Sequence, residues 1–135
     1  MRKIKFRVWD KCLKYMHICG ENGHDDCFYD ENNNFHYYNL QNGDGSGEKG
    51  NYILMQCTGL HDKNGTEIYE GDIVRIDCPT MKMTGEIKYS EMSAMFYLYD
   101  EIEDIEETLW YQEKEYEVLG NIYENSDLLK GEENG

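Results

Sequence analysis

Proline and long apolar stretches are almost absent from this chain of 135 residues. It has one proline and no run of eighteen consecutive apolar residues, which a membrane-spanning helix would need. Charged and apolar residues alternate from Arg2 onward, where a secreted protein would carry an apolar signal region. We therefore expect a cytoplasmic protein that does not engage a membrane.

Basic residues are the second shortage. Thirteen Lys and Arg face 28 Asp and Glu, so the formal net charge is −15. Residues 91–135 hold fourteen of the acidic residues and only two basic ones. A surface of this sign repels the phosphate backbone, which excludes general nucleic-acid binding. We expect no direct contact with nucleic acid.

Cysteine pairs of the CxxC type are also missing. The five cysteines are odd in number and, without an export signal, are expected to be reduced thiols. Cys12, Cys19, His24 and Cys27 are close enough in sequence to supply four zinc ligands, but their spacing matches no zinc knuckle or ribbon. We expect no bound metal, and a structural zinc ion held by these four residues is the alternative.

No catalytic constellation stands out. Four serines and four histidines are scattered without a nucleophile-and-base pair. Residues 45–50 match the letters GxGxxG, but the residues that follow predict a strand where a dinucleotide site needs a helix. We therefore expect no catalytic residue, no cofactor and no enzymatic activity.

What the chain does have is aromatic residues and alternating patterns. Twelve Tyr, four Phe and two Trp favour half-buried strands. In residues 3–9, the apolar Ile4, Phe6 and Val8 alternate with basic residues, which is the period of a strand with one buried face. The pair Asn64-Gly65 predicts a tight turn. Similar patterns predict strands at 15–18, 28–29, 35–38, 52–57, 67–69, 73–77, 84–89, 94–99 and 116–123.

These strands predict a mainly β protein in two parts. An N-terminal β-hairpin region covers residues 1–41, a glycine-rich linker or loop 42–51, a small SH3-like β-barrel 52–125, and a C-terminal turn and tail 126–135. One short amphipathic helix is expected within Glu101–Gln112, because Ile102, Ile105 and Leu109 recur at helical spacing.

Three segments carry a family likeness. They are Met1–Asp10 (MRKIKFRVWD), Leu54–Val74 (LMQCTGLHDKNGTEIYEGDIV) and Val118–Asn125 (VLGNIYEN). In order and spacing they resemble the YopX family of small proteins encoded by bacteriophages and prophages. The resemblance implies a mainly β, YopX-like fold with a barrel in the C-terminal part, and a home in the cytoplasm of a bacterial host. It implies no established activity.

Function is therefore inferred from charge. Six carboxylates crowd one short stretch: Asp100, Glu101, Glu103, Asp104, Glu106 and Glu107. We interpret them as a candidate face for binding a host or phage protein, and a basic partner fits the charge. The chain is then a nonenzymatic phage accessory protein. Two alternatives stay open: a DNA mimic that inhibits a host nucleic-acid-binding protein, and a metal-dependent nuclease or other enzyme that uses the clustered carboxylates.

The cysteine spacing generates a prediction about zinc. Elemental analysis of the purified protein should find no stoichiometric zinc, because the spacing of the four candidate ligands matches no zinc-binding pattern. One zinc ion per chain, lost on combining Cys19→Ser with Cys27→Ser, would show instead that a metal holds the N-terminal region together.

Overall fold

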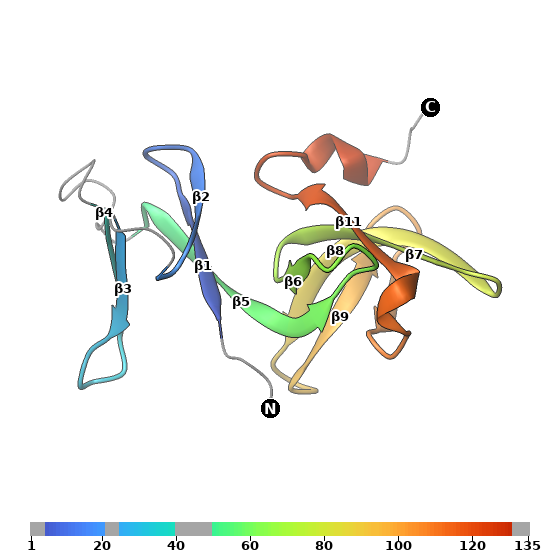
Figure 1. Ribbon diagram of the computed structural model, residues 1–135, viewed down its shortest axis with the longest axis horizontal. Coiled ribbons are helices and arrows are strands. Elements are labelled where there is room, and N and C mark those ends of the chain that lie inside the picture. The colour runs from blue at the N-terminus through green and yellow to red at the C-terminus, as the bar shows by residue number, and fades with distance from the viewer. Residues whose placement is uncertain (1–4, 21–24, 40–49, 131–135) are drawn as a thin grey trace. The chain divides into compact units, whose positions relative to one another are not determined.

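The computed structural model describes residues 5–20, 25–39 and 50–130, and strands dominate them (Figure 1). The mainly β fold predicted from the alternating sequence is confirmed. Two compact units divide the chain, residues 3–56 and residues 57–135, and the long strand β5 (Tyr52–His61) contributes to both. The glycine-rich segment 42–51 falls mostly outside the described residues. No helix in the described part of the chain has the length and apolar character needed to span a bilayer.

The first unit contains two antiparallel hairpins. β1 (Phe6–Asp10) pairs with β2 (Tyr15–Ile18) on one side and with the beginning of β5 on the other. β3 (Asp25–Tyr29) pairs with β4 (Phe35–Asn39) in a separate two-stranded sheet. These hairpins contain the predicted strands at residues 3–9, 15–18, 28–29 and 35–38, and their loops are residues 11–14 and 30–34.

A buried carboxylate joins these two hairpins. Asp10 is fully buried, and its Oδ2 accepts a hydrogen bond of 2.9 Å from the hydroxyl of Tyr37 in β4. Its Oδ1 accepts the backbone N–H groups of Cys12 and Leu13, at 2.9 Å each. Because a buried carboxylate must find hydrogen-bond donors, Asp10 fixes both its own loop and the position of Tyr37.

The second unit is built on a five-stranded antiparallel sheet in the order β10-β9-β8-β7-β11. Its strands are β7 (Asp72–Cys78), β8 (Met81–Ser90), β9 (Met95–Asp100), β10 (Ile105–Thr108) and β11 (Tyr116–Asn121). The short β6 (Glu67–Tyr69) pairs with the end of β5. Two 3-10 turns, η1 (Glu113–Glu115) and η2 (Ser126–Lys130), flank β11 (Figure 1). The closer likeness to an SH3-like barrel stays a prediction.

One face of this sheet forms the core. Along β7, Val74 and Ile76 are buried whereas Arg75 and Asp77 between them are exposed, which is the alternation that the sequence predicted. A slip of one residue would send the two apolar side chains to solvent, so burial specifies the register. The same cluster also buries Ile68, Ile87, Leu98 and Tyr116.

Strands β8 and β9 approach each other closely at one glycine. A Cβ atom added at Gly85 in β8 would lie 2.6 Å from the carbonyl carbon of Tyr99 in β9 and would clash with its oxygen. Real Cβ atoms are not found that close to backbone. Position 85 therefore admits only glycine, because the two strands approach here more closely than a side chain allows.

The predicted turn at Asn64-Gly65 is confirmed, and a neighbouring carboxylate holds it. Oδ1 of the buried Asp62 accepts the backbone N–H groups of Asn64 and Thr66, and Gly65 takes a φ of +83°. The other oxygen, Oδ2, accepts the N–H of Val118 at 2.8 Å. Asp62 thereby ties the β5–β6 turn to the outer edge of β11.

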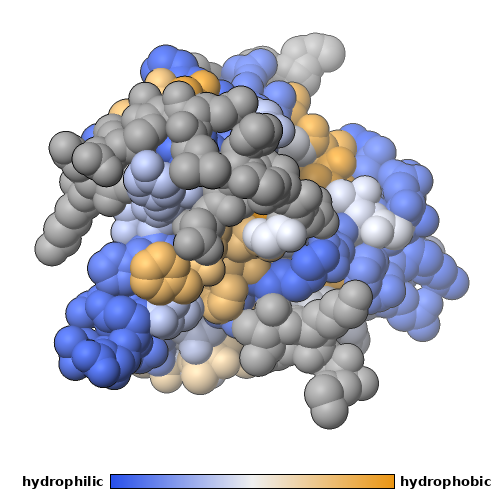
Figure 2. Space-filling model, turned by 60° about the vertical axis from the view of Figure 1, so that its left-hand side comes forward, coloured by the Kyte–Doolittle hydropathy of each residue, from blue (hydrophilic) through white to orange (hydrophobic). Residues whose placement is uncertain are grey.

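The predicted helix within Glu101–Gln112 is wrong. Residues 101–104 form a loop and Ile105–Thr108 form β10, which pairs with β9. Ile102 and Ile105 are 55% and 46% exposed, so no core lies beneath them to stabilise an amphipathic helix. Among the coloured residues of the face drawn in Figure 2, hydrophilic ones predominate, with smaller apolar patches between them.

We predict that Gly85→Ala lowers the free energy of unfolding by about 3 kcal/mol, because the new methyl group must displace the β9 backbone. Urea unfolding followed by circular dichroism measures this change. Gly65→Asn is the matched control: no atom lies within 4 Å of a Cβ at that position, and Asn tolerates positive φ. Equal losses in both variants would contradict the close approach at Gly85.

We predict that Asp62→Asn destabilises the protein by about 2 kcal/mol at pH 7, with a smaller effect in acid. Burial alone would raise the pKa of Asp62, but the N–H groups of Val118, Thr66 and Asn64 outweigh it and lower the pKa below its ordinary range. The carboxylate's contribution is therefore complete above about pH 4 and is lost as pH falls through the lowered pKa. Urea unfolding at pH 7 and pH 3 measures the difference, and Asp127→Asn on the exposed η2 should cost almost nothing at either pH.

Candidate functional site

The six predicted site carboxylates lie on one hairpin at the edge of the sheet. We call residues 95–108, which comprise β9, its loop and β10, the acidic hairpin. The loop carries Glu101, Glu103 and Asp104, while Glu106 and Glu107 lie on β10. Asp100 ends β9. The structure thus brings all six to one edge element, although the predicted local structure was helical.

Asp100 explains why this segment forms a hairpin. Its Oδ1 accepts the backbone N–H groups of Ile102 and Glu103, at 3.0 and 3.2 Å. Asp104 closes the four-residue loop with a φ of +56°, a conformation that Asp tolerates better than most residues. The loop after Asp10 has the same length, the same acceptor position and a positive φ at its last residue, Lys14. An Asp before four loop residues, which occurs at both positions, is the sequence pattern that could have predicted a hairpin here instead of a helix.

Two more of the six carboxylates also make hydrogen bonds within the hairpin and its flank. Asp104 accepts a bond of 2.7 Å from the Tyr99 hydroxyl, and this bond raises the pKa of Tyr99 to about 12. Glu107 accepts bonds from the Trp110 indole and the Tyr111 hydroxyl. Within the described residues, the carboxylates of Glu101, Glu103 and Glu106 make no hydrogen bond or ion pair, and all three side chains are exposed.

The carboxylates of the acidic hairpin form no ion pair among the described residues. No Lys or Arg occurs between Lys88 and Lys114. Arg75 and Lys82 share a surface cavity of about 490 Å³ with Asp100 and Glu103. Their ion pairs, however, are with Glu117 and Asp77 on neighbouring strands. The exposed carboxylates therefore face solvent as a group of one sign.

The two edges of the sheet differ. β11 ends the sheet on one side, but the N–H of Lys63 donates to the Tyr116 carbonyl and Asp62 accepts from Val118, so the β5–β6 turn covers that edge. β10 ends the sheet on the other side and pairs only with β9 among the described strands. Charged side chains on such an edge discourage pairing with a second copy of the same strand.

Metal binding gains no support from the geometry. Among the described residues, no group of three or more His, Cys, Asp and Glu side chains is placed to hold a metal ion. Cys12, Cys19 and Cys27 are not in disulfides, and His24 lies outside the described residues. The clustered carboxylates thus provide no observation that favours the nuclease alternative.

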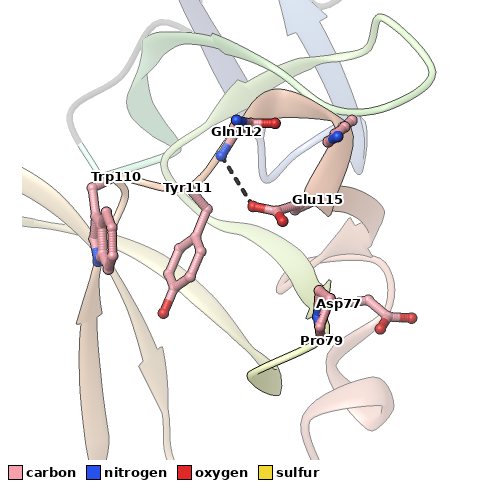
Figure 3. Close-up of a pocket in the computed structure, with 7 residues that line it drawn as sticks. Asp77, Pro79, Trp110, Tyr111, Gln112 and Glu115 are labelled. Atoms are coloured by element: carbon pink, nitrogen blue, oxygen red, sulfur yellow. Dashed lines mark hydrogen bonds between the residues drawn. The ribbon is translucent and has the colours of Figure 1, made fainter.

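A cavity next to the acidic hairpin was missed by sequence reasoning. It has a volume of about 620 Å³, and Trp110 and Tyr111 stand on one side of it, with Pro79 and Asp77 across from them (Figure 3). Trp110 is 71% exposed, although it is the largest apolar side chain on this surface. Gln112, Lys114 and Glu115 complete the lining from η1 and the residue before it. The two consecutive aromatic residues alone did not predict a cavity, because its lining comes from two segments, 77–79 and 110–115, that are distant in the sequence.

Comparison with known proteins supports the fold. The structure is similar to protein EF1440 from Enterococcus faecalis, with 29% identity, a TM-score of 0.62, and coverage of 96% of this chain and 99% of that one. It is also similar to the YopX protein from Bacillus subtilis, with 23% identity, a TM-score of 0.65, and coverage of 98% and 100%. No curated protein matches the sequence.

The family follows from the sequence match. The family model described as YopX protein matches residues 5–130, which is nearly the whole chain. Each of the three segments that carried the resemblance overlaps this range. The chain belongs to the YopX protein family.

Proposed function

We propose that this protein is a nonenzymatic binding module whose acidic hairpin docks onto a basic protein of the host or the phage. The observation that supports this function best is the exposure of Glu101, Glu103 and Glu106, which form no ion pair within the described residues. Carboxylates that serve stability alone are paired or bonded to backbone, as Asp62 and Asp100 are. These three make no such bond within the described residues.

The surface also has the mixed character of a protein interface. Ile102 and Ile105, which lie among the carboxylates, are about half exposed. The exposed Trp110 follows two residues after the end of β10 in the sequence. Apolar side chains supply most of the affinity in protein complexes, whereas charges mainly govern the encounter rate and partner choice. A basic partner would be attracted by the carboxylates and held by burial of the isoleucines.

The charge selects the class of partner. A chain with a net charge of −15 and unpaired carboxylates on an edge hairpin repels nucleic acid and attracts Lys- and Arg-rich surfaces. Attraction between exposed charges weakens as salt rises, because the Debye length falls from about 10 Å at 0.1 M to about 3 Å at 1 M. Binding through the acidic hairpin should therefore depend strongly on salt.

The test neutralises only carboxylates that do not hold the fold. The triple variant Glu101→Gln, Glu103→Gln, Glu106→Gln should retain the stability of the original protein, because Asp100, Asp104 and Glu107 keep their hydrogen bonds. Immobilised protein is exposed to bacterial lysate at several salt concentrations, and the bound proteins are quantified by mass spectrometry. We expect basic proteins that are released by high salt and are at least about tenfold depleted on the triple variant.

A matched control separates this surface from net charge. The control variant combines Glu31→Gln, Glu91→Gln and Asp127→Asn, which remove the same charge from exposed positions outside the acidic hairpin. This variant should capture the same basic proteins as the original chain. If the two triple variants lose them equally, overall charge is responsible, and the acidic hairpin is not the docking surface.

A further inference from the structure

We propose that the cavity formed by Trp110, Tyr111 and Pro79 binds a proline-rich, polyproline II segment that carries a basic residue. The inference rests on the proposed function, because it names the chemistry of a partner segment that docks beside the acidic hairpin. None of the six predicted carboxylates lines this cavity, although Glu107 accepts a hydrogen bond from each of its two aromatic side chains.

The geometry suits an extended chain. Trp110 and Tyr111 lie with ring centroids 4.8 Å apart and ring planes inclined by 31°, and Pro79 faces them across the opening (Figure 3). A polyproline II helix has three residues per turn and presents proline rings that pack between aromatic side chains. Its carbonyl groups carry no internal hydrogen bonds, and Lys114 on the rim offers a donor to them.

The aromatic rings are held in place before any ligand arrives. A single oxygen, Oε2 of Glu107, accepts both the Trp110 indole N–H at 3.2 Å and the Tyr111 hydroxyl at 3.0 Å. Tyr111 also packs edge-on against the buried Tyr116, and its backbone N–H donates to the Tyr116 hydroxyl at 3.0 Å. Rigid aromatic side chains lose little entropy on binding, and a polyproline II segment is itself preformed.

Charge decides between a peptide and a nucleic acid. Stacked aromatic side chains also bind bases, but such sites sit in positively charged grooves that follow the phosphates. Here Asp77 and Glu115 line the cavity, with Lys114 as its one cation among the described lining residues. The ion pair of Asp77 with Lys82 is exposed on both sides, at 3.4 Å, and is therefore weak. An Arg or Lys of the ligand can compete for these carboxylates.

Residues 1–135 contain no proline-rich segment that could serve as the ligand. Pro79 is the only proline of the chain and already forms a wall of the cavity. A second copy therefore offers no proline-rich segment of its own within this sequence.

The probe is decaproline with two arginines at one end, added to the full-length isotope-labelled chain. The indole N–H resonance of Trp110, assigned by its loss in Trp110→Phe, should shift and saturate. Trp110→Ala should weaken binding by at least about tenfold, measured by anisotropy of a labelled peptide. Met92→Ala, at a side chain that is 98% exposed on the β8–β9 loop, is the control and should not change the affinity.

Two comparisons separate the contributions of proline and charge. Asp77→Asn with Glu115→Gln should weaken the arginine peptide by about threefold or more and leave plain decaproline unchanged. A glycine-serine peptide with the same two arginines should not bind. Equal binding of that peptide, or unchanged affinity in Trp110→Ala, would overturn the proposal. An indole shift that depends on protein concentration without peptide would also overturn it, because a second copy of the chain would then occupy the cavity.

Failure of this inference is distinguishable from failure of the proposed function. The Glu101, Glu103 and Glu106 triple variant should bind the arginine peptide within about threefold of the original chain, because those carboxylates do not line the cavity. No peptide binding, together with salt-sensitive capture of basic proteins by the original chain, would overturn the inference alone.

Discussion

Five hairpin loops in the described part of this protein depend on a polar side chain that binds the backbone of the loop that follows it. Asp10, Asp30, Asp62 and Asp100 each accept two N–H groups from residues two to four positions ahead, and Ser90 accepts one. Fixing the loop fixes the pairing of the strands on either side, and the period of two then decides which side chains are buried. The strand registers and the apolar core follow from these local bonds.

The same chemistry sorts the many carboxylates of the chain. Those that bind backbone hold the fold: Asp62 reaches Val118, which is 56 residues away in sequence, and Asp10 reaches Tyr37 on another hairpin. Those that bind no neighbour, such as Glu103 and Glu106, remain on an exposed edge where salt screens their charge. Hydrogen bonding, and not composition, thus distinguishes the two groups of carboxylates.

Sequence reasoning found most strands and failed at the acidic segment for a physical reason. Alternation in β7 and the Asn64-Gly65 turn are local signals, and both elements form as predicted. Ile102, Ile105 and Leu109 have helical spacing, but an amphipathic helix needs a core against its apolar face. The Asp100 carboxylate instead accepts backbone N–H groups of the loop, which stabilises a hairpin. The Trp110 cavity escaped prediction because Glu107, Met81 and Tyr116 hold Tyr111 from three different segments.

Both functional proposals depend on the acidic segment being a hairpin at the sheet edge, because a helix would place Glu107 and the two rings differently. Nuclear Overhauser effects in the full-length, isotope-labelled protein test this most directly. The hairpin predicts cross-strand contacts between the backbone protons of Glu106 and Tyr99 and of Thr108 and Tyr97, which face each other in β10 and β9. Medium-range contacts between residues three apart across Glu101–Gln112, which a helix would give, would contradict the account if the cross-strand contacts were absent.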